Sequence, residues 1–264
     1  MTASTSTSTF PILTVEDVHI SYPDGTHAVR GVSLELMAGE TLGLVGESGS
    51  GKSSLARAMV GLERVRSGTV GYRGVELPRD LRLPRAVRLD LQMVFQDPAS
   101  ALNPRRRIGA ALADALRART GERPSTDEVV ALLRSVGLGP QFALRYPAEA
   151  SGGQLQRVVI ARALAPRPQV LVADEAVSAL DVSVQAQILD LLADLKEQFN
   201  LSMVFVSHDL GVIRHVSDRV AVLRGGEVVE LGETEELVAR PQHPYTQQLL
   251  AAVPDVDEAA ARAV

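Results

Sequence analysis

The residues whose types and spacing best suit chemistry form one glycine-rich segment, Gly46–Ser53 (Gly-Glu-Ser-Gly-Ser-Gly-Lys-Ser). Glycine allows the backbone to adopt positive φ and to approach a ligand without a Cβ clash. The successive N–H groups of such a loop form a concave nest that binds anions. Lys52 adds a full positive charge, and the Ser53 hydroxyl suits Mg²⁺. The pattern therefore predicts a site for nucleotide phosphates.

The residues on either side of this loop predict the elements that hold it. Thr41–Val45 is a short apolar run, which is typical of a buried strand. From Lys52 onward, Leu55, Met59 and Leu62 recur at three- and four-residue spacing and indicate a helix. A strand, a glycine loop and a helix are the context that this phosphate motif requires, and the helix adds its unpaired N–H groups and positive dipole end.

Two carboxylates end a second apolar run, Val170–Glu175. Continuous apolar strands indicate a parallel sheet that is covered on both faces, and ligands of such sheets bind at the carboxyl ends of the strands. We therefore expect Asp174 and Glu175 beside the glycine loop, one holding Mg²⁺ through water and the next polarising an attacking water. His208 follows the apolar strand Ser202–Ser207 at the same edge, where it could contact a γ-phosphate or be an ordinary polar residue.

Two further signals are weaker. Ser151-Gly152-Gly153-Gln154 opens a predicted helix that runs to about residue 165, with Ser151 as its N-cap. Its glycines could admit an anion or make a flexible helix entrance. Tyr22 ends the predicted strand Ile12–Tyr22, and its ring could stack on a purine or cap the sheet.

The remaining pattern predicts the organisation of the chain. Two alternating segments before the glycine loop, Ile12–Tyr22 and Val29–Leu36, favour antiparallel strands. Residues 97–165 are mostly helical and predict a separate subdomain. The Arg- and Pro-rich segment Leu77–Leu89 predicts irregular structure. Beyond residue 232 we expect a helical C-terminal extension.

Composition narrows the possible classes of protein. The length of 264 residues is enough for one large α/β domain or a domain with a small appendage. Apolar residues are 45% and charged residues 22% of the chain, which is an ordinary globular balance. The net charge of −5 argues against a broad nucleic-acid surface. The lack of cysteine excludes disulfides, thiolate zinc sites and thiol nucleophiles. No apolar run approaches the ~20 residues of a membrane-spanning helix, and the Ser/Thr-rich residues 1–10 predict a disordered tail, so any membrane role would be peripheral.

Taken in order, these segments resemble the ABC-transporter ATPases over about residues 11–232. Seven matches carry the resemblance: Walker A (Gly46–Ser53), the Q-loop glutamine (Gln96), the signature (Ser151–Gln154), Walker B (Val170–Asp174), the catalytic glutamate (Glu175), the D-loop (Ser178–Asp181) and the switch histidine (His208). The resemblance implies an α/β P-loop NTPase fold with a mostly parallel core sheet, an N-terminal antiparallel β-subdomain and an α-helical signature subdomain at about 97–165.

A narrower resemblance is to the ATPase subunits of oligopeptide, dipeptide and nickel importers. It rests on Val94–Pro98, Ala101–Arg105 and the His-Pro-Tyr segment Pro241–Thr246 within the extension 233–264. It implies a subunit that hydrolyses ATP to energise import of peptides or a related solute. The alternative is a soluble ABC ATPase of a non-transport complex, such as a phosphonate-breakdown assembly. A GTPase or small-molecule kinase is disfavoured by Ser151–Gln154 and His208.

The family resemblance also implies roles for individual residues. Those expected to act in catalysis are Lys52, Gln96, Glu175 and His208. Those expected to bind ATP are Tyr22, Gly46, Glu47, Ser48, Gly49, Ser50, Gly51, Lys52, Ser53, Ser54, Ser151, Gly152, Gly153, Gln154 and Asp181. Those expected to hold Mg²⁺ are Ser53, Gln96 and Asp174.

The resemblance implies partners as well. Two ATPase subunits, identical or different, would face each other head to tail, with each ATP between Walker A of one and Ser151–Gln154 of the other. Membrane permease subunits would bind the pair at the cytoplasmic face of the cell membrane, an extracytoplasmic solute-binding protein would act indirectly, and no nucleic acid is expected. Three residues depart from the family pattern without removing a catalytic group: Ala150, Leu155 and Ala176.

Overall fold

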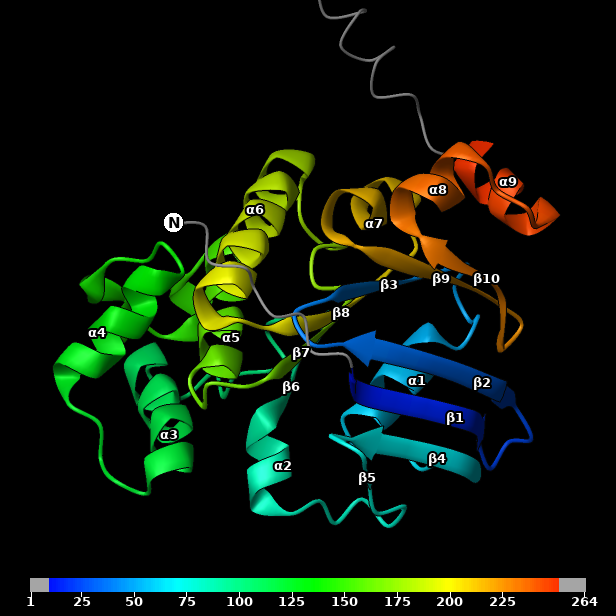
Figure 1. Cartoon of the computed structure of the whole chain (residues 1–264). Coiled ribbons are helices and arrows are strands. Elements are labelled where there is room, and N and C mark those ends of the chain that lie inside the picture. Colours follow the sequence, from blue (N-terminus) through cyan, green and yellow to red (C-terminus); the bar gives the residue numbers. More distant parts are fainter. Residues whose placement is uncertain (1–9, 252–264) are drawn as a thin grey trace, which may run out of the picture.

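The computed structural model describes residues 10–251, which form two β-sheets and the helices around them (Figure 1). The tail expected at residues 1–10 lies outside the described residues except for Phe10. The strands are β1 (Pro11–Ser21), β2 (His27–Met37), β3 (Thr41–Val45), β4 (Ser67–Tyr72), β5 (Val75–Glu76), β6 (Leu91–Val94), β7 (Val170–Asp174), β8 (Ser202–Ser207), β9 (Arg219–Arg224) and β10 (Glu227–Glu233). The α-helices are α1 (Lys52–Met59), α2 (Arg85–Asp90), α3 (Ile108–Thr120), α4 (Thr126–Ser135), α5 (Gly152–Leu164), α6 (Val182–Phe199), α7 (Leu210–Val216), α8 (Thr234–Ala239) and α9 (Pro244–Ala251).

The central sheet has six strands in the order β10-β9-β3-β8-β7-β6. Strands β9, β3, β8, β7 and β6 are parallel, and only β10, at the edge, is antiparallel to its neighbour. Every residue of β3, β7 and β8 is buried, as their uninterrupted apolar character predicts. The parallel direction brings the carboxyl ends of these strands to one edge of the sheet, where the glycine loop follows β3.

The second sheet is antiparallel, in the order β2-β1-β4-β5. In β2, buried Val32, Leu34 and Leu36 alternate with exposed residues, so one face of the sheet is covered. That face joins α1 and one side of the central sheet in a single apolar cluster. The other side of the central sheet packs on helices α3 to α9. Helix α1 is therefore held between two sheets, which fixes the position of the loop that precedes it.

The segment between β6 and β7 contains α3, α4 and α5 together with two short 3₁₀ turns, Pro140–Leu144 and Pro147–Glu149. Helix α5 packs against α3, α4, α6 and β6, so it connects these helices to the central sheet. Figure 1 shows α3 and α4 to one side of the sheets, away from α1. The expected α/β architecture with an antiparallel N-terminal sheet is confirmed, whereas the exact boundaries of the subdomains stay a prediction.

Two local expectations were wrong. The predicted first helix included Leu62, but α1 ends at Met59 because Gly61, at φ 69°, closes it with the hydrogen bonds Gly61 N–H to Ala58 O and Leu62 N–H to Arg57 O. Leu62 is left 51% exposed. The segment expected to be irregular contains α2, which begins directly after Pro84, a position where a missing N–H removes no helical bond.

Among the helices of residues 10–251, none is long and apolar enough to cross a membrane.

Candidate nucleotide-binding site

The glycine loop between β3 and α1 has the backbone conformation that its composition predicts. Gly46, Gly49 and Gly51 have φ angles of 152°, 80° and 99°. A Cβ on Gly51 would lie 2.1 Å from the carbonyl oxygen of Ala28, so the position accepts only glycine. No side chain among the described residues caps the start of α1. The N–H groups of its first turn are therefore available to a ligand.

Lys52, the first residue of α1, points back into this loop. Its side chain donates from Nζ to Gly46 O at 2.7 Å and to Glu47 O at 2.8 Å, and the residue is only 3% exposed. Burial lowers the pKa of Lys52, while the nearby carboxylates of Glu175 and Asp174 act in the opposite direction. A buried cation beside uncapped N–H groups makes this loop strongly attractive to an anion.

The hydroxyl of Ser53 and the carboxylate of Asp174 meet beside the loop. Ser53 Oγ donates to Asp174 Oδ1 at 2.7 Å, and Asp174, at the end of β7, is 2% exposed. Burial raises the pKa of Asp174; the hydrogen bond from Ser53 and the guanidinium of Arg57, 3.7 Å away, oppose this shift. Hydroxyl and carboxylate oxygens are hard ligands that suit Mg²⁺.

This pair of oxygen ligands alone does not make a complete metal cage. Within residues 10–251, no group of three or more His, Asp or Glu residues is arranged to hold a metal ion. Mg²⁺ in phosphate-transfer sites is held by one or two protein oxygens together with substrate phosphates and water. Ser53 and Asp174 therefore fit a metal ion that arrives with a nucleotide.

Glu175, directly after β7, contacts residues that follow the carboxyl ends of β6 and β8. Gln96, after β6, donates from Nε2 to Glu175 Oε2 at 2.8 Å, and His208 Nδ1, after β8, lies 3.7 Å from Glu175 Oε1. Glu175 has a positive φ of 48°, which is uncommon outside glycine and is characteristic of functional sites. Its N–H is held by Val206 O at 3.0 Å. A carboxylate, an amide and an imidazole thus converge within reach of one reacting group.

Tyr22 lies beside the first helix rather than free above the loop. Its hydroxyl hydrogen-bonds to Ser54 Oγ at 2.8 Å and donates to Glu63 Oε2 at 3.1 Å, while the side chain is half-buried. These bonds fix the ring next to α1. Both alternatives for Tyr22, stacking on a purine and capping the sheet, stay predictions.

The Ser151–Gln154 turn forms the start of α5 and is bonded to itself. Ser151 Oγ accepts the N–H of Gln154, and Gln154 Oε1 accepts the N–H of Ser151. A Cβ on Gly153 would lie 2.5 Å from Val184 Cγ1, so its lack of a side chain lets α5 approach α6. In residues 10–251, no hydrogen bond or ion pair joins this turn to the glycine loop or to Glu175. Within the described chain, the turn is thus separate from the glycine loop and from the polar cluster around Glu175.

Asp181 has a local role in the structure. Its carboxylate caps α6 by accepting the N–H of Val184 at 3.0 Å and the hydroxyl of Ser183 at 2.8 Å. The hydrogen bond from the Val184 N–H leads the contacts that hold the pKa of Asp181 below its ordinary value. Any contact of Asp181 with a nucleotide stays a prediction.

Comparison with known families shows to which family this chain belongs. The family described as ABC transporter matches residues 29–178, more than half of the chain. The chain belongs to the ABC transporter family. The family described as the oligopeptide/dipeptide transporter C-terminal region matches residues 229–264. This ABC transporter chain is therefore an ATP-binding subunit that hydrolyses ATP, as its sequence motifs predicted.

Individual relatives agree with this assignment. The oligopeptide transport ATP-binding protein OppF of Escherichia coli is 48% identical over 242 residues, which cover 89% of this chain and 72% of that protein. The oligopeptide transport ATP-binding protein AppF of Bacillus subtilis is 48% identical over 231 residues, covering 86% and 70%. The glutathione import ATP-binding protein GsiA of Escherichia coli is 49% identical over 234 residues, covering 86% of this chain and 37% of that protein.

A solved structure has the same fold. It is cbiO1 from Clostridium perfringens, described as part of the ABC transporter complex cbiONQ. The TM-score is 0.75 at 24% sequence identity, and the match covers 95% of this chain and 99% of that chain. At this identity the likeness shows the fold, and it confirms the ABC ATPase architecture.

Two residues of the ATPase site were not predicted from the sequence. Arg57 reaches Asp174, and Ser178 donates from Oγ to Glu175 O at 3.0 Å. Arg57 follows Ser53 by four residues on α1, and this spacing places both on one helix face. That spacing was the available signal for Arg57. For Ser178, the sequence indicates only its place as the first residue of the Ser178–Asp181 loop.

The three residues that depart from the family pattern, Ala150, Leu155 and Ala176, pack in or against an apolar cluster of this ATPase. Leu155 and Ala176 are 8% and 2% exposed and belong to the apolar cluster of the helices, against which half-buried Ala150 packs. Their effect on the rate stays a prediction.

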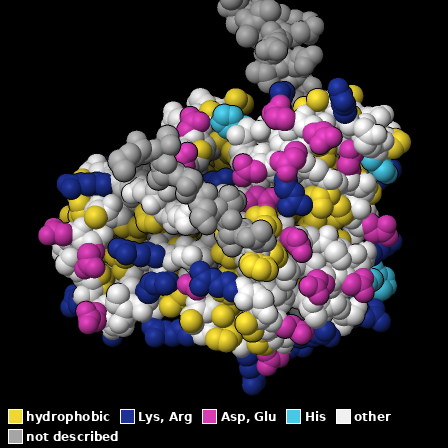
Figure 2. All heavy atoms as spheres, in the orientation of Figure 1, with side chains coloured by type: hydrophobic (Ala, Val, Ile, Leu, Met, Phe, Trp, Pro, Cys, Tyr) yellow, Lys and Arg dark blue, Asp and Glu magenta, His cyan; other side chains and the backbone are white. Residues whose placement is uncertain are grey.

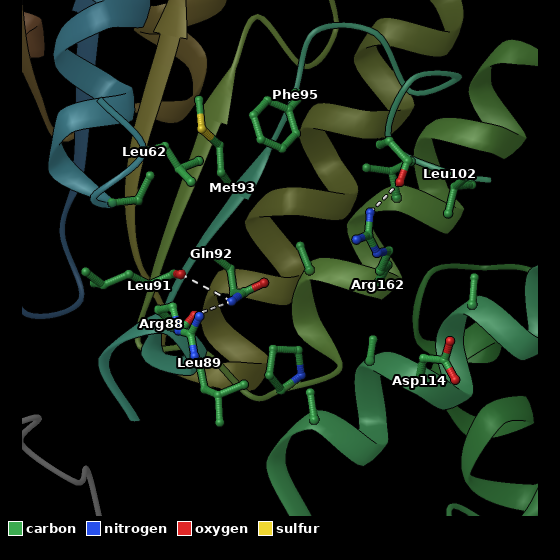
Figure 3. A pocket seen from close by; sticks show the side chains of 18 of the residues that line it. Leu62, Arg88, Leu89, Leu91, Gln92, Met93, Phe95, Leu102, Asp114 and Arg162 are labelled. Carbon is green, nitrogen blue, oxygen red and sulfur yellow. Dashed lines mark hydrogen bonds between the residues drawn. The ribbon is translucent and has the colours of Figure 1, made fainter. Parts of the chain in front are cut away.

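A groove of about 580 Å³ lies between β6 and helices α3 and α5 of the ATPase (Figure 3). Leu62, Met93 and Phe95 line it on the sheet side, and Arg162 of α5 points into it with its guanidinium donating to Ala101 O. Figure 2 shows dark blue Lys and Arg side chains gathered in the lower half of the view, around the region of α2 and α3. The groove therefore combines apolar walls with charged side chains that include Arg88, Arg106, Arg162 and Asp114, of which Arg106 and Asp114 form an ion pair.

Proposed function

We propose that this chain is the ATPase subunit of a membrane importer for peptides or a related solute, nickel included. The convergence of Gln96, Glu175 and His208 beside the glycine loop is the observation that supports ATP hydrolysis. The solute class is supported by relatives named for oligopeptide transport and glutathione import. Glutathione is itself a small peptide, so these names agree on one class of cargo.

In the proposed reaction the glycine loop binds the phosphates. The N–H groups of the loop and of the first turn of α1 hydrogen-bond to phosphate oxygens, and Lys52 neutralises the outer phosphates. The residues proposed to make these contacts are Gly46, Glu47, Ser48, Gly49, Ser50, Gly51, Lys52, Ser53 and Ser54. Tyr22 stacks on the adenine. Because these donors are fixed before ATP arrives, little reorganisation opposes binding.

The carboxyl ends of β6, β7 and β8 provide the hydrolytic groups. Glu175 orients and polarises the attacking water, and His208 contacts the γ-phosphate. Ser53, Asp174 and Gln96 hold Mg²⁺, which supplies charge neutralisation for the phosphate oxygens when it is bound. The hydrogen bond between Gln96 and Glu175 keeps the amide next to the carboxylate that it must position.

A second subunit completes the site in this proposal. Ser151 and Gly152 are exposed, and their turn is not bonded to the glycine loop of the same chain. We infer that the turn, with Asp181, faces the ATP held by a partner subunit arranged head to tail. Each chain then holds Walker A for one ATP and the signature for the other.

The groove beside β6 is the proposed contact with the permease. Phe95 lines this groove, and Gln96, the next residue, bonds to Glu175. A permease segment that fills the groove would therefore touch the residue adjacent to the hydrolytic cluster. Its apolar walls and its arginines fit a short apolar segment that carries acidic groups. In this arrangement the chain binds at the cytoplasmic face of the membrane, and a solute-binding protein acts only through the permease.

The competing function is ATP hydrolysis in a non-transport complex, such as one for phosphonate breakdown. The relatives described above are all named for transport or import, which favours the importer. Affinity purification of the tagged chain from membranes, followed by identification of its partners, distinguishes the two. Co-purification with an integral membrane protein and a solute-binding protein is expected, and recovery with non-membrane enzymes alone would exclude the importer.

Glu175→Gln tests the hydrolytic role. The substitution keeps an oxygen that can accept from Gln96 but removes the basic carboxylate, so kcat should fall by about 10²–10⁴-fold while ATP binding is retained. Phosphate release at saturating ATP and equilibrium binding of ATP are the two measurements. Glu235→Gln, which alters an exposed ion pair with Arg214, is the control. Hydrolysis by Glu175→Gln within a few-fold of the wild type would contradict the assignment.

A further inference from the structure

The C-terminal helix α9 makes a direct contact with the glycine loop. The backbone N–H of Glu47 donates to the hydroxyl oxygen of Tyr245 at 2.9 Å, across 198 residues of sequence. Tyr245 is only 2% exposed and ranks among the largest fully buried side chains of the described structure. Figure 1 shows α9 next to β10 at the upper edge of the molecule. A side chain of the extension thus reaches the centre of the site.

The contact involves the same peptide group that Lys52 holds. The carbonyl oxygen of Gly46 accepts from Lys52 Nζ at 2.7 Å, and the N–H of the same Gly46–Glu47 peptide donates to Tyr245. The peptide is therefore fixed at both ends. Because a peptide group is planar, rotation that frees its N–H would also turn its carbonyl away from Lys52.

The position of Tyr245 is itself well determined. The Arg224 guanidinium lies 4.8 Å from the centre of the Tyr245 ring. The backbone N–H of Tyr245 donates to His243 Nδ1 at 3.1 Å. The Glu230 carboxylate accepts the N–H groups of Gln242 and His243. Burial raises the pKa of Tyr245, so the side chain is a neutral phenol at pH 7. The hydroxyl therefore keeps its own proton while its oxygen accepts from the Glu47 N–H.

The β9–β10 hairpin supports the loop from the same side. Gly226 N–H donates to Ser50 O at 3.1 Å, and a Cβ on Gly46 would lie 2.1 Å from Leu223 O. Arg224, which covers the Tyr245 ring, belongs to this hairpin. The hairpin and α9 therefore both contact the back of the glycine loop. Among the described residues, Tyr245 is the only side chain that accepts a hydrogen bond from the Glu47 N–H.

We propose that Tyr245 is a positioning residue for ATP binding, acting on Lys52 through the Gly46–Glu47 peptide. The proposal rests on the proposed nucleotide site. Tyr245 restricts the loop to its binding conformation before ATP arrives, so less conformational freedom is lost on binding. Its removal should raise the Kd and KM for ATP and leave kcat nearly unchanged, because no hydrogen bond of Tyr245 in the described structure reaches Gln96, Glu175 or His208.

Tyr245→Phe is the direct test, because it removes only the hydroxyl. Tyr72→Phe is a matched control: Tyr72 is 5% exposed, its hydroxyl donates to Asp90 at 3.2 Å, and Arg73 lies 5.5 Å from its ring centre. Loss of one hydrogen bond predicts an ATP Kd raised about three- to tenfold for Tyr245→Phe, with kcat within twofold of the wild type. Tyr72→Phe should lower thermal stability about as much as Tyr245→Phe does, because each loses one buried hydrogen bond, but it should leave the Kd for ATP unchanged.

Hydrogen exchange of the Glu47 amide is the second measurement, and it should accelerate in Tyr245→Phe alone. An ATP Kd within twofold of the wild type in Tyr245→Phe, or an equal rise in Tyr72→Phe, would overturn the proposal. Lys52→Ala, measured in the same assay, separates the two levels of inference. If Lys52→Ala bound ATP normally, the nucleotide site itself would be wrong; if it lost binding while Tyr245→Phe did not change, only the role of Tyr245 would be wrong.

Discussion

Two helix N-termini in this ATPase carry glycines, that of α1 in the loop before it and that of α5 in its first two residues, but their free N–H groups are satisfied in opposite ways. Helix α1 begins after Gly51 with no side-chain cap in the described structure, and its first residue, Lys52, is buried. Helix α5 begins with a complete capping box between Ser151 and Gln154, and its start is exposed. The same positive dipole end is therefore open in one helix and satisfied in the other.

This difference fits the proposed arrangement, in which one chain holds two unequal halves of a site. At the start of α1, burial and the lack of a side-chain cap leave backbone N–H groups without a hydrogen-bond acceptor from a side chain of the described residues. These unpaired donors favour binding of an anion. At α5, the cap stabilises the turn by itself, so the isolated chain needs no ligand there. We infer that α1 binds nucleotide within a single chain and that α5 acts only when a partner subunit presents a nucleotide to it.

Lys52→Ala gives the largest effect expected from this comparison. Charge-assisted hydrogen bonds contribute about 1.5–3 kcal/mol each, so the loss of two to phosphate oxygens should weaken ATP binding about 10²–10⁴-fold. Lys196→Ala is the control, since Lys196 is the other lysine of the chain and pairs with Asp218 at 2.8 Å. Equilibrium binding of ATP checks the result, and similar affinities of the two variants would remove the distinction between the helix starts.

Ser151→Arg tests the proposed role of the exposed start of α5. The bulky charge should block the contact with a partner's ATP and reduce hydrolysis about 10²-fold, while binding of ATP to the single chain is unchanged. Ser125→Arg is a matched control, because Ser125 caps α4 in the same kind of box with Glu128. Each substitution removes one cap and should cost about 1 kcal/mol of stability. Normal hydrolysis by Ser151→Arg would contradict the head-to-tail dimer.

Asp174→Asn gives the smallest effect and concerns stability at the α1 site. The folded pKa of Asp174 lies above its unfolded value, so its contribution to stability is greatest below the unfolded pKa and is lost as pH rises through the folded pKa. At neutral pH the ATP-free variant should therefore have a higher Tm than the wild type, and the gain should vanish in acid.

Thermal unfolding at several pH values, with and without Mg²⁺ and ATP, checks this prediction. The wild type should gain more stability than Asp174→Asn when both are added, since the variant lacks one proposed metal ligand. Asp90→Asn is the control, because Asp90 pairs with Arg119 and accepts from Tyr72, so its loss should lower the Tm. A Tm decrease for Asp174→Asn at neutral pH would show that its carboxylate is stabilised in the fold.

Much of the central sheet and of the glycine-loop site could be predicted because their signals are local. The buried strands are continuous apolar runs, and the phosphate motif occupies eight consecutive residues, Gly46–Ser53. The rule that parallel strands present their carboxyl ends at one edge then placed Asp174 beside Ser53 in advance. The end of α1 was missed because the apolar spacing that reached Leu62 outweighed Gly61, whose positive φ closes the helix.

The sequence by itself determined the family, the strand–loop–helix order and the identity of the polar groups that the site could use. Only the tertiary structure decided which of these groups meet. The bond from Gln96 to Glu175 and the contact of Tyr245 with Glu47 join residues 79 and 198 positions apart. Their geometry depends on how sheets and helices pack, and a shift of about 1 Å breaks a hydrogen bond. No local periodicity specifies positions to that accuracy.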